Sequence, residues 1–268
     1  MLAEHQSSLH RIDWLQPSQP EINPLVASLS KFVSLDQADI QAIEHISRHR
    51  RKFQATETLV HQESRSKFVC LLLSGLAFRY RHLPDGKRQI FGFLLPGDLC
   101  DTHFVISNKC DHNVALLSDA EVAMISISEL MGVIVGHAKI ERALLMTSLV
   151  DAAILREWLI NIGQRDAIQK LSHLFCELSA RMHSRGAVNP DGSFSIPITQ
   201  AELADTIGLT PVHVNRSLQR LRREGLVVWS GRRLTIVNRA SLEMIAGFDG
   251  QYLQLDAEPI SPKLCAYG

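Results

Sequence analysis

The segment TQAELADTIGLTPVHVNRSLQRLRR, residues Thr199 to Arg223, has the pattern of two short helices joined by a tight turn. Gln200–Ile207 is the first predicted helix. The turn follows at Gly208, since glycine tolerates the left-handed backbone that such turns need. Thr210 is a good N-cap for the second helix, because its hydroxyl can accept a hydrogen bond from a free amide one turn later. Pro211 then occupies the first helical position, where its missing N–H costs nothing. The segment is therefore predicted to form a helix-turn-helix.

Each predicted helix has one apolar face. These inner faces consist of Leu203, Ala204 and Ile207 in the first helix and of Val214, Leu218 and Leu221 in the second. The outer face of the second helix carries residue types that read base edges or hold phosphates. They are His213, Asn215, Arg216, Gln219, Arg220, Arg222 and Arg223. This pattern indicates a DNA-binding unit, and the alternative is an ordinary helical hairpin with a solvated basic face.

The charge distribution agrees with DNA binding. The 268 residues are 46% hydrophobic and 21% charged, as in an ordinary globular protein, and their formal net charge is zero. Between Thr210 and Ala240, however, seven arginines accompany one acidic residue, Glu224. Phosphate neutralisation needs such a local cluster and does not need a high overall isoelectric point.

Other features of the sequence limit the class of protein. No secretory signal and no run of the ~18 apolar residues that a membrane span needs is visible, so we expect a cytoplasmic protein. The five cysteines, at positions 70, 100, 110, 176 and 265, are odd in number and lack paired spacing, so we expect free thiols. No catalytic motif is present, so we do not expect an enzyme.

The hydrophobic pattern predicts an α+β chain. Short strands with glycine turns follow two short helices and predict an antiparallel, jelly-roll-like β-roll. A short strand is predicted at 196–198, just before the helix-turn-helix, and a hairpin, the wing, follows it. The expected regions are an N-terminal arm (1–20), a β-roll sensor domain (21–136), a dimerisation helix (137–164), a winged helix-turn-helix domain (165–250) and a loose tail (251–268).

The longest helical pattern runs from His137 to Ile162 and contains no proline or glycine. Its apolar residues occupy more than one face, at positions 140, 144, 145, 149, 150, 154, 155, 158, 159 and 162. A helix that is apolar on two faces must bury both. We expect one face to pack on the roll of the same chain and the other on the same helix of a second subunit.

The order of β-roll, long helix and winged helix-turn-helix resembles the Crp/Fnr family of bacterial transcription regulators over roughly residues 22–248. The helix-turn-helix segment is the more specific match. The roll segment VCLLLSGLAFRYRHLPDGKRQIFGFLLPGD also matches the family's pattern of a glycine turn, a hairpin and a Pro-Gly-acidic turn. The resemblance implies a homodimer on a pseudo-palindromic operator, with RNA polymerase as a further partner.

The resemblance also implies roles for single residues. Arg216 matches the arginine that usually contacts a guanine, and bidentate pairing to O6 and N7 is the physical reason. His213 and Asn215 are further candidate base readers. Val212 stands where the cyclic-AMP and fumarate-nitrate branches carry a glutamate, so we expect a different half-site, with Val212 able to pack on a thymine methyl group. The expected phosphate contacts are Thr199, Gln200, Thr210, Arg220, Arg222, Arg223, Arg232 and Arg233.

The roll departs from the effector sites of the family. Cyclic-nucleotide members have a Gly-Glu-Leu turn and an arginine that holds the cyclic phosphate. This chain has a Gly-Asp-Leu turn at 97–99 and no arginine at 109–113, so we do not expect cyclic AMP to bind. Iron–sulfur members carry a cluster of cysteines near the N-terminus. The first cysteine here is Cys70, so an iron–sulfur cluster is not expected either.

One group of donor residues remains near the Gly-Asp-Leu turn: Cys100, Asp101, His103, Cys110 and His112. Thiolate, carboxylate and imidazole together could bind metal or haem or form a thiol redox site. Some haem-binding members of the family use His or Cys in this part of the roll. The alternatives are an unidentified small ligand or a hydrophilic loop whose histidines only make hydrogen bonds. A haem, metal or redox sensor that acts through protein partners is the alternative to a DNA-binding regulator.

Overall fold

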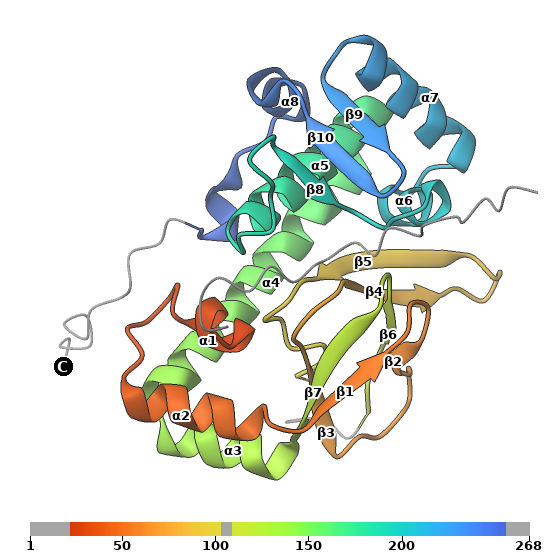
Figure 1. Cartoon of the computed structure of the whole chain (residues 1–268). Helices are drawn as coiled ribbons and strands as arrows, with labels where there is room; N and C mark the ends of the chain where they lie inside the picture. The colour runs from red at the N-terminus through yellow and green to blue at the C-terminus, as the bar shows by residue number, and fades with distance from the viewer. Residues whose placement is uncertain (1–21, 103–108, 256–268) are drawn as a thin grey trace, which may run out of the picture.

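The computed structural model describes residues 22–102 and 109–255. The N-terminal half is a β-roll of two antiparallel sheets (Figure 1), with the strand orders β1-β7-β3 and β2-β6-β4-β5. The strands are β1 (Arg50–Phe53), β2 (Thr58–Val60), β3 (Phe68–Leu72), β4 (Ala77–His82), β5 (Arg88–Leu94), β6 (Asn113–Leu116) and β7 (Ala120–Ser126). The predicted α+β class and jelly-roll-like roll are confirmed.

Strand β3 is apolar on both faces because both faces are covered. Val69 and Leu71 lie in a cluster with buried residues of the long helix Ala138–Gln164 and of three shorter helices. The shorter helices are α1 (Pro24–Leu29), α2 (Gln37–Ile46) and α3 (Ile127–Gly136). Cys70 and Leu72 belong instead to the cluster between the two sheets. The alternation follows from the two-residue period of a strand.

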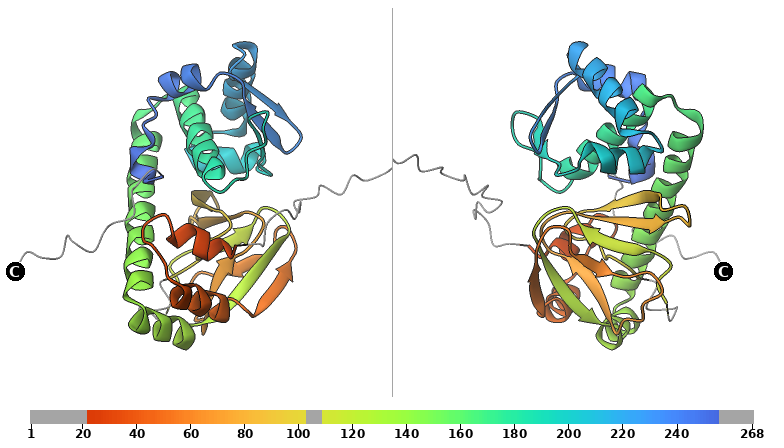
Figure 2. Two further views of the ribbon diagram at one scale, coloured as in Figure 1. Left: turned by 60° about the vertical axis from the view of Figure 1, so that its left-hand side comes forward. Right: turned by 90° about the vertical axis from the view of Figure 1, so that its right-hand side faces the viewer.

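Helix α4 (Ala138–Gln164) runs along the roll and continues to the C-terminal half (Figure 2). Its inner face buries Ile140, Ala143, Ile154 and Trp158, while the opposite face leaves a stripe of large apolar residues exposed. The sequence-based prediction of two apolar faces is therefore confirmed within the subunit. Of the helices in the described ranges, none is both long enough and apolar enough to cross a membrane.

The C-terminal half is a winged helix-turn-helix. Its elements are α5 (Ala167–His183), β8 (Ser193–Ser195), α6 (Gln200–Ile207), α7 (Pro211–Arg223), β9 (Val227–Ser230), β10 (Arg233–Ile236), α8 (Arg239–Ala246) and a 3-10 helix, η2 (Gly250–Leu253). The strands form a sheet of order β8-β10-β9. The strand predicted at 196–198 is wrong, and the paired strand is β8. Pro197 has no N–H to give to a sheet, whereas Phe194 pairs with Leu234.

The two halves contact each other at several places, and α6 and η2 make two of the contacts that involve the C-terminal half. Helix α6 lies against β5, where Arg88 Nε donates to Asp205 Oδ2 at 2.8 Å and Gln89 Nε2 donates to the Thr206 carbonyl at 3.2 Å. Helix η2 packs on α4 and α5 and buries Leu253. Residues 251–255 thus differ from the loose tail expected from 251 onward; the rest of that tail and the arm at 1–20 lie outside the described residues.

Candidate nucleic-acid interface and roll site

Helix α6 begins with a capping box. Thr199 Oγ1 accepts from the Glu202 amide at 3.1 Å, and Glu202 Oε2 accepts from the Thr199 amide at 2.7 Å. The helix ends at Gly208, whose φ of 65° is the left-handed conformation that glycine adopts without strain. These local signals fix both ends of the helix that supports α7.

Helix α7 is held by its apolar face and presents its basic face to solvent. Thr210 Oγ1 caps the helix by accepting from the His213 amide at 3.4 Å. Val214, Leu218 and Leu221 are buried in the same cluster as the inner residues of α6. All four candidate base readers are exposed: Val212, His213, Asn215 and Arg216. Exposure on one side of a rigidly packed helix is the arrangement that major-groove reading needs.

Several candidate phosphate contacts surround a groove between α6 and the wing. The groove has a volume of about 360 Å³ and is lined by Ile198, Thr199, Gln200, Leu218, Arg222, Trp229, Gly231 and Arg232, with Pro197 at its edge. Thr210, Arg220, Arg223, Arg232 and Arg233 are all exposed. Arg220 Nε pairs with Glu224 at 2.8 Å. Arg222 differs, because its Nη2 donates to the Trp229 carbonyl at 2.7 Å and so joins α7 to the wing.

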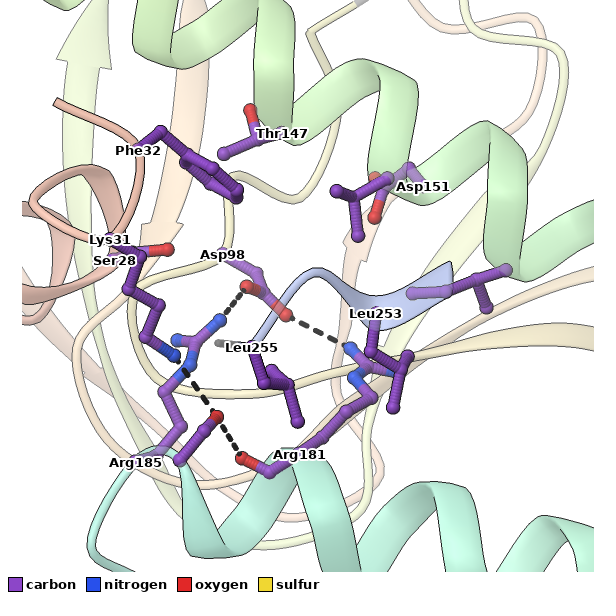
Figure 3. Close-up of a pocket in the computed structure, with 13 residues that line it drawn as sticks. Ser28, Lys31, Phe32, Asp98, Thr147, Asp151, Arg181, Arg185, Leu253 and Leu255 are labelled. Atoms are coloured by element: carbon purple, nitrogen blue, oxygen red, sulfur yellow. Dashed lines mark hydrogen bonds and ion pairs between the residues drawn. The ribbon is translucent and has the colours of Figure 1, made fainter. Parts of the chain in front are cut away.

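Asp98 of the Gly-Asp-Leu turn faces the C-terminal half of the chain (Figure 3). Its carboxylate lies 2.6 Å from Arg185 Nη2 and 3.3 Å from Arg181 Nη2, both on or just after α5. Burial alone would raise the pKa of Asp98, but the two guanidinium charges and the Leu95 amide outweigh it and hold the pKa below its ordinary value. Asp98 is therefore an ion-pair partner that links the roll to α5.

The cavity beside Asp98 is small. It has a volume of about 60 Å³ and is lined by residues from α1, α4, α5 and the C-terminal segment, among them Lys31, Asp151 and Leu253 (Figure 3). Burial and the charge of Arg185 lower the pKa of Lys31 to about 8. Sites for small organic ligands usually have ~300–1,000 Å³, so this cavity does not fit a nucleotide.

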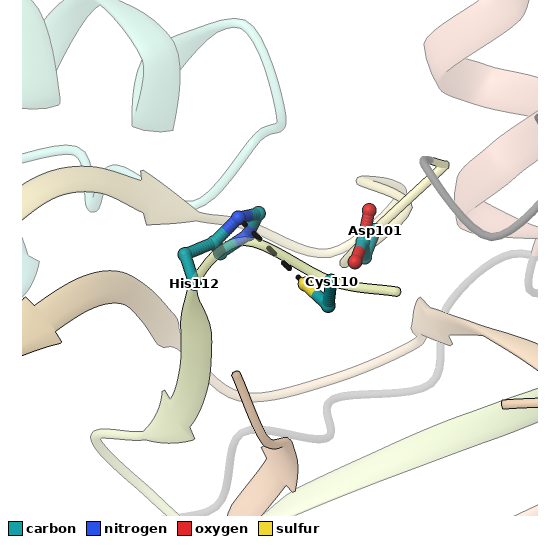
Figure 4. Close-up of side chains that lie close together, drawn as sticks. All are labelled: Asp101, Cys110 and His112. Atoms are coloured by element: carbon teal, nitrogen blue, oxygen red, sulfur yellow. Dashed lines mark hydrogen bonds between the residues drawn. The ribbon is translucent and has the colours of Figure 1, made fainter. Parts of the chain in front are cut away.

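Three of the predicted donor residues meet at the end of the roll (Figure 4). One potential ligand atom from each of Asp101, Cys110 and His112 lies within 4.8 Å of the others, and all three residues are buried. Cys110 Sγ is 3.8 Å from His112 Nδ1. Cys100 is buried nearby but does not belong to this trio, and His103 lies outside the described residues.

Burial governs the thiols of the roll. It raises the pKa of Cys100 well above the ordinary value and, together with a hydrogen bond to Asp101, raises that of Cys110 to about 12. Such thiols hold little thiolate at neutral pH, and the thiolate is the form that reacts. The geometry therefore disfavours the thiol redox interpretation.

Arg79, which is partly exposed, and Glu177, which is buried, were among the ionic residues not identified from the sequence. Arg79 on β4 donates to the carbonyls of Leu99 and Cys100 at 3.1 and 3.3 Å and pairs with Asp151 on α4 at 3.1 Å. Glu177 on α5 is fully buried and accepts from Trp158 and Tyr252, each at 2.9 Å. For Arg79 and for Glu177, the signal available in the sequence was a charged residue next to apolar residues, which indicates an ionic group inside the fold.

A β-roll, a long helix and a winged helix-turn-helix together define a class of DNA-binding transcription regulators. Residues 169–245 match the Crp-like helix-turn-helix domain, and residues 50–137 match the cyclic nucleotide-binding domain. The chain belongs to the Crp/Fnr family.

Similar proteins agree with this assignment. The nitrogen fixation regulation protein FixK of Bradyrhizobium diazoefficiens is 28% identical over 219 residues, which cover 80% of this chain and 88% of FixK. The transcriptional activator protein FnrL of Cereibacter sphaeroides is 26% identical over 75% of this chain and 81% of FnrL. The structure of FixK2 from Bradyrhizobium japonicum has the same fold, with a TM-score of 0.66 and 21% identity, and the match covers 75% of this chain and 98% of that one.

Proposed function

We propose that the protein acts as a homodimer that binds a pseudo-palindromic DNA operator through α7. The observation that carries this proposal is the exposed, basic outer face of a helix whose other face is packed in the core. Two-fold symmetry would place two such helices in successive major grooves, so the half-sites should be centred about 10 bp apart, or slightly more.

The proposed roles of the interface residues follow from their chemistry and their exposure. Arg216 has the fork geometry to pair with guanine O6 and N7, and His213 and Asn215 flank it on the same exposed side. Asn215 Nδ2 donates to Gln200 Oε1 at 3.1 Å, which pre-orients its side chain. The exposed arginines of α7 and the wing hold phosphates in this proposal, so binding should weaken steeply with salt.

The proposed dimer forms along the exposed face of α4. Leu145, Leu149, Leu159 and Ile160 are exposed there and lie at spacings of four, ten and one residues, which place them on one side of a helix. This side is opposite to the buried Ile154 and Trp158. Because two relatives carry the names of transcriptional activators, FnrL and FnrA, we also propose activation with RNA polymerase as the partner.

Selection of bound duplexes from a random pool tests the DNA proposal. The wild-type protein should enrich a palindrome, and Arg216→Ala should lose the sequence preference while retaining salt-sensitive, non-specific binding. Arg239→Ala is the matched control, because Arg239 is an exposed arginine on α8, paired with Glu243, and should enrich the same palindrome as the wild type. A pool without any enriched palindrome would contradict the proposal.

A further inference from the structure

The donor trio at the end of the roll combines three different ligand types in one place. Cys110 offers a sulfur, His112 an imidazole nitrogen and Asp101 a carboxylate oxygen, and their ligand atoms lie within 4.8 Å of one another. Cys110 Sγ lies 3.8 Å from His112 Nδ1, so the thiol and the imidazole ring are close neighbours.

The surroundings of the trio favour an ion over an organic ligand. Asp101, Cys110 and His112 are each exposed by 5% or less. Cys110 lies in the cluster of apolar residues between the two sheets, which includes Val114 and Leu116. Neither of the two cavities described above is lined by any of the three residues. The donor trio is therefore surrounded by apolar packing and is separate from both of these cavities.

We propose that Asp101, Cys110 and His112 bind one divalent transition-metal ion of the zinc type. Sulfur, imidazole and carboxylate are the ligand set that zinc takes in proteins, and three protein ligands leave a fourth position for water or for a small ligand. Binding replaces the thiol proton of Cys110, which is released to solvent, and the thiolate and carboxylate then balance the charge of the ion.

Asp111 is a positioning residue for this site. Its Oδ1 lies 2.7 Å from His112 Nδ1. A carboxylate only accepts hydrogen bonds, so this contact favours the tautomer with the proton on Nδ1 and the lone pair on Nε2. Carboxylates that hold a metal-binding histidine in this way are common, and their loss weakens metal binding by about 10- to 100-fold.

The site is connected to the rest of the molecule through the residues just before Asp101. The carbonyls of Leu99 and Cys100 accept from Arg79, whose other end pairs with Asp151 on α4. A metal ion that fixes Asp101 would therefore act on the contact between the roll and the long helix. The prediction that the metal changes DNA affinity rests on the proposed function. The proposal of the metal site does not depend on that function.

Cobalt titration of the full-length protein tests the site in the absence of DNA. After removal of metals with a chelator, Co²⁺ should bind at one equivalent per chain and give intense visible bands of a tetrahedral ion and a sulfur-to-cobalt charge-transfer band. Cys110→Ser should abolish the charge-transfer band, and Asp111→Ala should weaken binding about 10- to 100-fold. Cys176→Ser is the matched control, because Cys176 is also a buried thiol but lies on α5, and it should leave the spectrum unchanged.

A second measurement covers the case in which Cys110→Ser does not fold. X-ray absorption of the wild-type zinc form should show one sulfur ligand at about 2.3 Å. Absence of cobalt binding, a charge-transfer band that persists in a folded Cys110→Ser protein, zinc ligated by nitrogen and oxygen alone, or a haem spectrum of the purified protein would each overturn the proposal.

The link to DNA is tested separately. Operator binding should differ between the metal-free and zinc forms by about 5- to 150-fold, the usual range of coupling between two sites, and operator DNA should change zinc affinity by the same factor. Arg79→Lys should reduce this factor while the cobalt spectrum stays intact. If both forms bind the operator equally well and the cobalt spectrum is normal, the coupling is refuted and the metal site stands. If neither form binds the operator, the proposed function is contradicted instead.

Discussion

Replacement of Leu159 by aspartate should separate the proposed dimer. Leu159 lies on the outer face of α4 and exposes 74% of its surface in the single subunit. It is the most exposed of the large apolar residues on that helix. We expect the second copy of α4 to bury this leucine. The aspartate would lack the apolar contact of the leucine, and its carboxylate would lose hydration in the interface.

The exposed fraction sets the size of the effect. Burial of a whole leucine side chain stabilises by about 1.5–3 kcal/mol, so burial of the exposed three quarters is worth about 1–2 kcal/mol. A two-fold interface contains the residue twice, which gives about 2–4 kcal/mol per dimer. The dimer dissociation constant of Leu159→Asp should therefore rise by at least about 30- to 700-fold.

Sedimentation equilibrium over nanomolar to micromolar concentrations measures this constant directly. Met244→Asp is the matched control, because Met244 exposes 82% of its surface on α8, away from α4. It should dissociate with the wild-type constant. Equal dissociation constants for Leu159→Asp and the wild type, or a wild-type protein that stays monomeric at micromolar concentration, would refute dimerisation through α4.

Three further substitutions address specificity, domain contact and pH. Val212→Glu should give the half-site a preference for cytosine worth about 1–3 kcal/mol, seen in duplex selection as a new enriched base. Asp98→Asn leaves two largely buried guanidinium groups without their carboxylate, so urea unfolding should show a loss of about 3 kcal/mol, whereas Asp85→Asn in an exposed turn should change nothing. Burial, with the charge of Arg165, lowers the pKa of His173 from 6.5 to about 4. The unfolded chain therefore binds a proton below pH 6.5 that the folded chain excludes. The free energy of unfolding should fall by up to about 3 kcal/mol as the pH drops to 4, and His173→Phe should reduce this dependence.

The helix-turn-helix was predictable in detail because its signals are local. Thr210 caps the second helix, and Gly208 ends the first with a positive φ, as their residue types suggested. The cap of the first helix by Thr199 was not predicted. The two faces of α4 were predictable for the same reason, since helical period alone assigns a residue to a face. Local chemistry also explains the one misplaced strand: the Ile196 amide still donates to the Arg232 carbonyl at 2.6 Å, but Pro197 has no N–H with which to continue the pairing.

The contacts between residues far apart along the chain could not be predicted from the sequence. Asp98 and Arg185 are 87 residues apart, and Glu177 and Tyr252 are 75 apart. No periodic pattern links such pairs, because tertiary folding alone brings them together. The clustering of Asp101 with Cys110 and His112 was predictable in part. The sequence places these residues near one turn and near the start of β6, which suggested that they lie close together. That Cys100 lies outside the trio could not be predicted, because the sequence does not show the direction of its side chain.

The turn at 96–101 combines three contacts within a few residues, and these contacts connect the roll to the rest of the molecule. Asp98 holds α5, the carbonyls of Leu99 and Cys100 hold Arg79 and through it α4, and Asp101 enters the donor trio. The two carboxylate oxygens of Asp98 pair with Arg181 and Arg185 of the C-terminal half. A ligand can shift the balance between two conformations only by its difference in affinity for them. Asp101 belongs to the donor trio and Asp98 contacts the DNA-binding half, so we expect such a difference to arise at one of these two residues if the ligand binds at the trio.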